Sequence, residues 1–241
     1  MDIYAHRGSS GTHPENTLAA FHEAARLPIV GVEFDVHLTK DGELVVIHDE
    51  SIHRTSNGSG FVKDLTLAEL KAYDFGSWFA PNFKDERIPT LREVLECFSN
   101  THHRINIELK SDIFPYDGMI EKVVGVIEDM QLHRRVILSS FDHSAIQKVK
   151  QLAPHVETAA LVMEVLVKPL DYIRTIPTDA LHLFFPIALR PAIQEVLAEN
   201  IAVRTFTVNE EPYALALKNI GVRAIFTDYP EKMLTFLHAK S

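Results

Sequence analysis

The chain has 241 residues, a formal net charge of -9 and a hydrophobic share of 46%. A chain of this length and apolar content buries a full core, so we expect one domain over residues 1–241. The acidic balance, without any run of Lys and Arg, argues against binding to nucleic acid or to an anionic membrane surface.

Two further features of the sequence bear on its cellular setting. Cys97 is the only cysteine, which excludes an intramolecular disulfide framework and agrees with a reducing compartment. No stretch approaches the ~18 apolar residues of a membrane span, and residues 1–6 lack the basic and apolar regions of a signal peptide. We therefore expect a cytoplasmic protein without stable membrane insertion, and a homo-oligomer stays open.

Short apolar segments alternate with longer amphipathic ones, which is typical of parallel strands joined by helices. Strands are predicted at residues 3–6, 31–38, 44–48, 104–110, 136–140, 158–162, 180–184, 203–208 and 224–227. Helices with a 3.6-residue period are predicted at residues 17–26, 118–130, 144–151, 190–200 and 211–220. About eight strands are followed by a crossover, which predicts an α/β fold of the TIM (β/α)8 barrel type, with chemistry at the strand C-termini.

Two segments interrupt this alternation. Residues 40–43 contain Asp41-Gly42, a pair that supplies the positive φ angles of a tight hairpin turn between two strands. Residues 50–91 form an irregular insertion, and an excursion of that length inside a compact domain is usually functional. Two interpretations stay open for it, a lid that only closes the barrel rim and a segment that contacts the substrate.

Carboxylates recur on one face of two predicted strands. Side chains two positions apart in a strand share a face, so Glu33 and Asp35 point away from their apolar neighbours. A second strand repeats the pattern with Asn106, Glu108 and Lys110. A solvated face is the usual interpretation of one such pair, but three carboxylates from two strands suit a hard divalent ion, Mg2+ or Ca2+. Lys110 would then lie near a phosphate that the metal holds.

Two of the thirteen histidines end a predicted strand beside carboxylates. His6 precedes Arg7, and His48 precedes Asp49 after the strand that returns from the hairpin. A neighbouring charge holds imidazole and imidazolium in balance near neutral pH, so both histidines are candidate acid and base groups. Other strand ends carry the polar or aromatic residues Ser139, Ser140, Phe141, Asn209 and Asp228. For these residues, a role in helix capping or core packing is as plausible as contact with a substrate.

Taken in order, the motifs of the chain resemble the glycerophosphodiester phosphodiesterase family over nearly the whole length. They are Ala5-His6-Arg7-Gly8, Pro14-Glu15-Asn16-Thr17, Glu33-Phe34-Asp35-Val36, Thr39-Lys40-Asp41-Gly42, Val46-Ile47-His48-Asp49, Arg54-Thr55, Ile88-Pro89-Thr90-Leu91, Ile107-Glu108-Leu109-Lys110, Ser139-Ser140-Phe141, Thr207-Val208-Asn209 and Thr227-Asp228-Tyr229-Pro230. One departure concerns the pocket for the substrate's alcohol, because Phe206 stands where relatives typically carry Trp.

The resemblance implies a TIM barrel with a small insertion between barrel strands 2 and 3, which is where residues 50–91 fall. It also implies one divalent metal ion, Mg2+ or Ca2+, with Mn2+ as a further option. The implied residues are Glu33, Asp35 and Glu108 for the metal, His6 and His48 for acid-base catalysis, and Arg7 and Lys110 for the phosphate, with Phe206 in the substrate pocket.

The expected reaction is hydrolysis of a small-molecule glycerophosphodiester to glycerol 3-phosphate and an alcohol. The first nucleophile is either water or the substrate's own glycerol 2-hydroxyl, and the sequence does not choose between them. One alternative is a phospholipase D-like phosphodiesterase or lyase that acts on lysophospholipids, although the acidic charge argues against a membrane surface. Another is a protein that binds a ligand without turning it over.

Overall fold

A computed structural model describes residues 1–239, whose nine strands form one sheet. The strands are β1 (Asp2–His6), β2 (Gly31–Leu38), β3 (Leu44–Val46), β4 (Arg104–Leu109), β5 (Val136–Ser140), β6 (Glu157–Val162), β7 (Ala180–Phe184), β8 (Ala202–Phe206) and β9 (Ala224–Thr227). β1 pairs in parallel with both β2 and β9, which closes the sheet into a barrel. β3 is antiparallel to β2 and lies outside the ring. The predicted TIM barrel is confirmed, with one extra strand.

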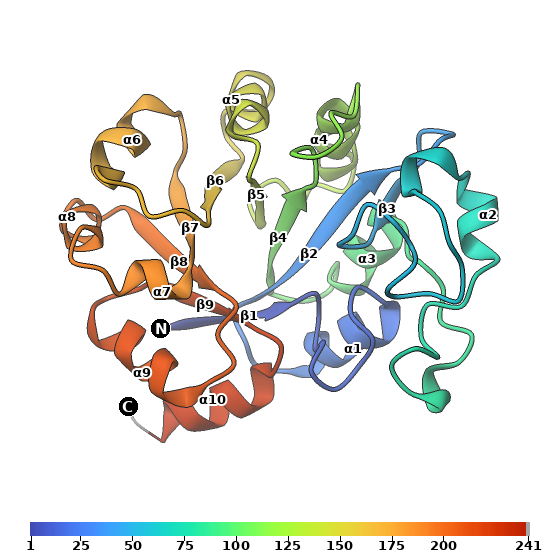
Figure 1. Ribbon diagram of the computed structural model, residues 1–241, viewed down its shortest axis with the longest axis horizontal. Coiled ribbons are helices and arrows are strands. Elements are labelled where there is room, and N and C mark those ends of the chain that lie inside the picture. Colours follow the sequence, from blue (N-terminus) through green and yellow to red (C-terminus); the bar gives the residue numbers. More distant parts are fainter. Residues whose placement is uncertain (240–241) are drawn as a thin grey trace.

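The helices surround this ring of strands (Figure 1). They are α1 (Leu18–Arg26), α2 (Leu67–Lys71), α3 (Leu91–Cys97), α4 (Met119–Asp129), α5 (His143–Leu152), α6 (Pro169–Thr175), α7 (Phe185–Ala188), α8 (Ile193–Ala198), α9 (Glu211–Asn219) and α10 (Pro230–His238). α8 begins three residues later than the periodicity predicted. The delay has a local cause, since Pro191 disfavours a helical conformation at the residue before it.

The register between β2 and β4 sets the two faces of the barrel wall. Asp35 pairs with Glu108 and Glu33 pairs with Asn106, so these polar side chains share the inner face. The residues between them, Phe34 and Ile107, are fully buried in the outer layer against the helices. The alternation read from the sequence is confirmed, and it places the carboxylates inside the barrel.

Two hydrophobic layers separate the strands from the helices. One layer joins β2, β4 and β5 to α1, α3, α4 and α5, and the other joins β7, β8 and β9 to the helices from α6 to α10. The barrel interior holds a small cluster that includes Tyr4, Ile137 and Phe226. This cluster lies between the two ends of the barrel, where the polar side chains of Glu33, Glu108 and Arg204 are found.

The segment at residues 50–91 lies between barrel strands β2 and β4, as the resemblance implied (Figure 1). It contains α2 and two short 3-10 helices, η1 (Val62–Asp64) and η2 (Pro81–Phe83). Its buried side chains, among them Ile52, Leu70 and Phe75, form a core of their own with Val45 and Ile47 from the hairpin. The insertion is therefore a packed unit held to the barrel through the hairpin.

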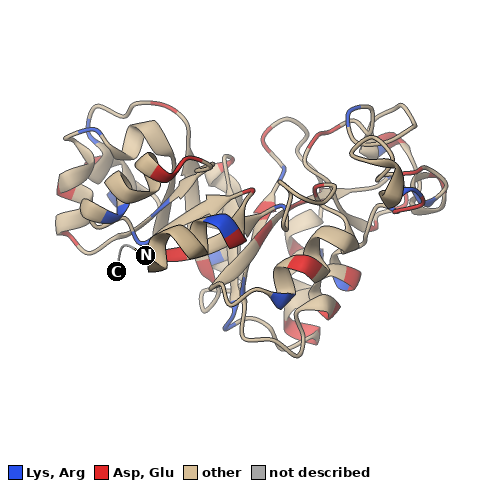
Figure 2. Ribbon diagram, turned by 90° about the horizontal axis from the view of Figure 1, so that it is seen from below, with Lys and Arg blue, Asp and Glu red and all other residues tan. Residues whose placement is uncertain are grey.

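Charged residues of both signs are scattered over the barrel and the insertion (Figure 2). Within residues 1–239, no helix is both long enough and apolar enough to cross a membrane. The predicted single domain also included Lys240 and Ser241, which lie outside the described residues.

Candidate active site

A cavity of about 370 Å³ opens at the C-terminal ends of the barrel strands. Its polar wall comes from β1, β2, β4 and the segment after β3, with the residues His6, Arg7, Glu33, His48, Asn106 and Glu108. No residue of the insertion at 50–91 lines this cavity among the described residues. The cavity therefore joins both predicted histidines to two of the three predicted carboxylates, and the insertion reaches the site only indirectly.

The loop after β1 turns sharply at Arg7 and Gly8, whose φ angles are 54° and 78°. A Cβ atom at Gly8 would lie 2.8 Å from the carbonyl carbon of Ala20 in α1, so only glycine allows this approach. The turn brings the backbone N–H of Arg7 to 3.0 Å from Glu33 Oε2, to which it donates a hydrogen bond. Thus the packing of the loop on α1 fixes one predicted metal ligand.

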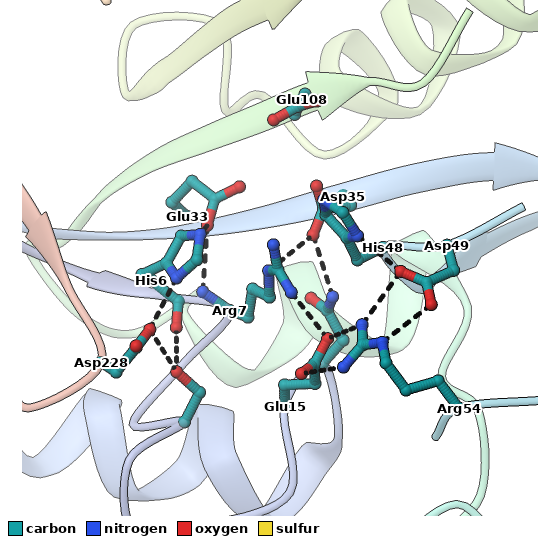
Figure 3. Close-up of polar contacts among 12 residues, drawn as sticks. His6, Arg7, Glu15, Glu33, Asp35, His48, Asp49, Arg54, Glu108 and Asp228 are labelled. Atoms are coloured by element: carbon teal, nitrogen blue, oxygen red, sulfur yellow. Dashed lines mark hydrogen bonds and ion pairs between the residues drawn. The ribbon is translucent and has the colours of Figure 1, made fainter. Parts of the chain in front are cut away.

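Glu33, Asp35 and Glu108 each place a carboxylate oxygen within 4.8 Å of the other two. Figure 3 shows Glu33 and Asp35 on β2 and Glu108 on the neighbouring strand β4. Asn16 donates a hydrogen bond to Asp35 at 3.0 Å, and Lys110 donates one to Glu108 at 3.0 Å. The structure therefore brings together all three predicted metal ligands in a setting suited to a hard cation.

The three carboxylates differ in their protonation behaviour. Burial raises the pKa of Glu33 well above its ordinary value, and the neighbouring charges of Asp35 and Glu108 add to this effect. Burial and the charge of Asp35 likewise raise the pKa of Glu108. Burial also opposes ionisation of Asp35, but the charges of His48 and Arg7 hold its pKa far below the ordinary value. Burial and mutual repulsion thus disfavour ionisation of both glutamates, and a bound cation would offset this penalty.

His6 is held by a network from the last barrel strand. Its Nδ1 lies 2.6 Å from Asp228 Oδ1, and its Nε2 lies 3.9 Å from Glu33 Oε2. Asn209 donates a hydrogen bond to the other oxygen of Asp228 at 2.6 Å. Burial is the largest influence on the pKa of His6 and lowers it, followed by the charge of Arg7. The pKa of Asp228 falls to about 2, because hydrogen bonds and the charge of His6 outweigh burial.

His48 is held by a second network that reaches into the insertion. Its Nδ1 lies 2.7 Å from Asp49 Oδ1. Arg54 donates to both oxygens of Asp49 at 2.8 and 3.0 Å, and to both oxygens of Glu15 at 2.8 Å. Glu15 also accepts a hydrogen bond from Arg7 Nη1 at 2.8 Å. Arg54 is the point at which the insertion supports the site, and Figure 3 shows this chain from His48 to Arg7.

Aromatic and aliphatic side chains form the opposite wall of the cavity. The wall consists of Phe141, Leu161, Met163, Phe184, Phe206 and Phe226. Phe206 stands at its centre, with ring centroids 5.9 Å from Phe141 and 6.5 Å from Phe184. The predicted substrate-binding position Phe206 therefore does line the cavity, on its apolar side.

The sequence did not predict the roles of several residues in the two networks that hold His6 and His48. Asp228 and Asn209 fitted capping as well as function, and only barrel closure shows that they hold His6. Asp49 directly follows His48, a signal that could have suggested the pairing. No spacing in the sequence connects Arg54 with Glu15, because 39 positions separate them. Lys110, which was expected to lie near the phosphate, donates a hydrogen bond to Glu108 and is not part of the cavity wall.

The chain is similar to proteins of known family over almost its entire length. The model of the glycerophosphoryl diester phosphodiesterase family matches residues 6–232. A glycerophosphodiester phosphodiesterase of Caldanaerobacter subterraneus subsp. tengcongensis is 40% identical over 235 residues, covering 98% of this chain and 97% of that protein. One from Bacillus altitudinis is 42% identical over 233 residues and covers 95% of both. An Oleispira antarctica phosphodiesterase, solved in complex with the product sn-glycerol-3-phosphate, superposes with a TM-score of 0.88 at 33% identity, covering 99% and 97%.

Proposed function

The chain belongs to the glycerophosphoryl diester phosphodiesterase family, and on this premise we propose that it hydrolyses glycerophosphodiesters by metal-assisted acid-base catalysis. The products are glycerol 3-phosphate and an alcohol. The single observation that carries the proposal is the placement of three buried carboxylates between two histidines at one cavity (Figure 3). This arrangement supplies a cation site and two proton-transfer groups within reach of one phosphodiester.

Glu33, Asp35 and Glu108 fit a divalent cation in both chemistry and charge. Their oxygens lie within 4.8 Å of one another, and burial raises the pKa of both glutamates. The side-chain Oδ1 atoms of Asn16 and Asn106 are buried nearby without a hydrogen-bond partner. Mg2+, Ca2+ or Mn2+ at this position would withdraw charge from the phosphoryl oxygens.

Arg7 is the residue best placed to bind the phosphate. Its guanidinium is held by Glu15 at 2.8 Å and lies 3.6 Å from Asp35, yet its Nε is buried without a hydrogen-bond partner. Arg7 also lines the cavity, where a phosphate oxygen would accept from its guanidinium group. Lys110 supports the same site through its hydrogen bond to Glu108, and it balances part of the carboxylate charge.

His6 and His48 flank the carboxylates on opposite sides (Figure 3). In each imidazole, Nδ1 faces an aspartate, Asp228 at 2.6 Å for His6 and Asp49 at 2.7 Å for His48. A hydrogen bond from Nδ1 to a carboxylate fixes the tautomer, so that Nε2 is the atom that exchanges a proton. One histidine takes a proton from the nucleophile, and the other gives one to the leaving alkoxide.

Metal removal and replacement tests the proposal directly. Protein stripped with EDTA is assayed for glycerol 3-phosphate release from a panel of deacylated phospholipids, before and after addition of Mg2+, Ca2+ or Mn2+. We expect activity to disappear on stripping and to return with at least one ion. Full activity in the stripped protein would refute the metal role, and no release under any condition would refute the hydrolysis.

A lysophospholipid is the second candidate substrate, and the apolar cavity wall favours it. The wall around Phe206 continues to Met163 and Val165, which are each 53% exposed beyond the end of β6. An acyl chain bonded to the substrate would find an apolar surface there. Turnover of lysophosphatidylcholine is compared with that of glycerophosphocholine, and the products are checked for a cyclic phosphate. A clear preference for the deacylated substrate would exclude this candidate.

A further inference from the structure

Three side chains with metal-binding atoms meet at the end of the barrel opposite the cavity. Glu128 lies in the last turn of α4, His133 lies in the turn before β5, and His155 lies in the connection before β6. One atom from each lies within 4.8 Å of the other two. His155 Nε2 is 2.6 Å from Glu128 Oε1, and His133 Nδ1 is 3.5 Å from Glu128 Oε2.

Hydrogen bonding among these residues does not account for all their polar atoms. His133 Nδ1 is buried and has no hydrogen-bond partner, although the carboxylate of Glu128 faces it. The last turn of α4 also carries Glu128 without a basic residue in the same turn, where the helix dipole disfavours negative charge, while Asp129 pairs with Arg92 at 2.6 Å. Both observations point to a cation between the three side chains.

We propose that Glu128, His133 and His155 bind one Zn2+ ion, with water completing the coordination. Two imidazole nitrogens and one carboxylate oxygen are a preferred ligand set for Zn2+. Ligand atoms about 2.0–2.1 Å from a tetrahedral zinc lie roughly 3.4 Å apart. One atom from each of the three side chains already lies within 4.8 Å of the other two, so modest side-chain shifts would reach this spacing. This set differs from the all-carboxylate set of Glu33, Asp35 and Glu108, which suits harder ions.

The position of the site assigns it a structural rather than a catalytic role. His133 and His155 lie in the segments that lead into β5 and β6, and both imidazoles face the same helix end. Zinc would tie these two connections to α4, so its binding would stabilise the folded state by mass action. The catalytic cavity lies at the other end of the strands, so hydrolysis should not depend on this ion.

Zinc binding is measured by calorimetry with the full chain in saturating Mg2+, together with the thermal midpoint in the presence and absence of Zn2+. The variants are His133→Gln and His155→Gln, with His102→Gln as the matched control. His102 is exposed and lies in the loop before β4, at the same end of the barrel. All four proteins are also assayed for phosphodiesterase activity in Mg2+ alone.

We expect wild type and His102→Gln to bind one more Zn2+ than either test variant, and only these two to gain thermal stability. The midpoint should rise on the order of 5 °C at a large excess of Zn2+ over its dissociation constant. Affinity in the test variants should fall by more than the roughly 10–100-fold seen when an outer-shell partner is lost. Equal binding by wild type and His155→Gln, or no Zn2+ bound by wild type, overturns the proposal.

Discussion

The two ends of the barrel shift the pKa of buried glutamates in opposite directions. At the C-terminal end, Glu33 and Glu108 share a buried space with Asp35, and burial raises the pKa of both glutamates. At the N-terminal end, Glu157 bridges Arg104 at 2.5 Å and Arg204 at 2.6 Å.

Burial works against ionisation of Glu157 too, but the charges of Arg204 and Arg104 outweigh it and lower the pKa. One end of the barrel therefore buries carboxylates whose ionisation is disfavoured until a cation offsets it, while the fold holds them in place. At the other end, the carboxylate of Glu157 is paired with two arginines of the protein itself, which serves stability. Five substitutions test this division between function and stability.

The largest effect is expected from the two histidines. His6→Ala or His48→Ala should lower turnover by about 10²–10⁴-fold, because each removes a proton-transfer group. The folded state should change little, since His48 is one-third exposed and the Asp228 partner of His6 retains other hydrogen bonds. Steady-state turnover is measured beside thermal unfolding. Turnover like that of wild type in either variant would remove that histidine from the mechanism.

A smaller effect on activity is expected from Asn16, which donates to Asp35 at 3.0 Å. Asn16→Gly removes this hydrogen bond and suits the backbone, because φ at this position is 56°. Loss of an outer-shell partner should weaken the affinity for the catalytic metal about 10–100-fold. Activity is titrated against Mg2+, and maximal turnover at saturating metal should largely recover. An unchanged metal dependence would show that Asn16 does not orient Asp35.

At the N-terminal end, Glu157→Gln should lower the free energy of unfolding by about 2 kcal/mol, because two charge-assisted hydrogen bonds are lost. Turnover should be retained below the melting range. The pKa of Glu157 is lowered on folding, so its stabilising contribution is complete above the ordinary glutamate pKa of about 4.3 and fades as pH falls through the lowered value.

Denaturant unfolding of wild type and Glu157→Gln at a series of pH values measures this contribution. The gap between the two proteins should be widest near neutral pH and close in acid. A gap that widens toward acid pH would mean that Glu157 is not the stabilising partner of the two arginines.

The smallest effect is expected outside both ends. Lys148 of α5 lies 2.6 Å from Glu121 of α4, and both side chains are nearly half exposed. Lys148→Ala should change the free energy of unfolding by less than about 1 kcal/mol, because water screens exposed pairs. Denaturant unfolding gives the value. A loss as large as that from Glu157→Gln would contradict the view that the paired charges at the barrel end are special.

The strands could be predicted well from the sequence, because outward apolar and inward polar side chains alternate along each strand of the barrel wall. Apolar residues on the outer face alternate with Glu33 and Asp35 on the inner face of β2, and β4 repeats the pattern. The same period would have predicted an inward His182 in β7, between Leu181 and Leu183. The period does not show the partner of that side chain, which is Arg204 on the neighbouring strand at 3.1 Å.

The supporting networks could not be predicted in the same way. His6 and Asp228 are 222 positions apart and meet only because β1 pairs with β9. Arg54 reaches Glu15 from an insertion whose fold follows from its own small core rather than from a periodic pattern. Local periodicity shows which way a side chain points, but barrel closure decides which distant residue it meets.

The register of the hairpin between β2 and β3 fixes the length of the turn at Asp41-Gly42. The insertion that follows the hairpin is not bound by this register. Val36 pairs with Val46, and this pairing carries His48 back beside Asp35. Adding one residue to the turn at Asp41-Gly42 would reverse the faces of β3 and turn the returning chain away from the cavity. Residues added within the insertion would leave this register unchanged, because the insertion follows His48 in the chain. Related sequences should therefore differ in length within the insertion while the turn keeps its count.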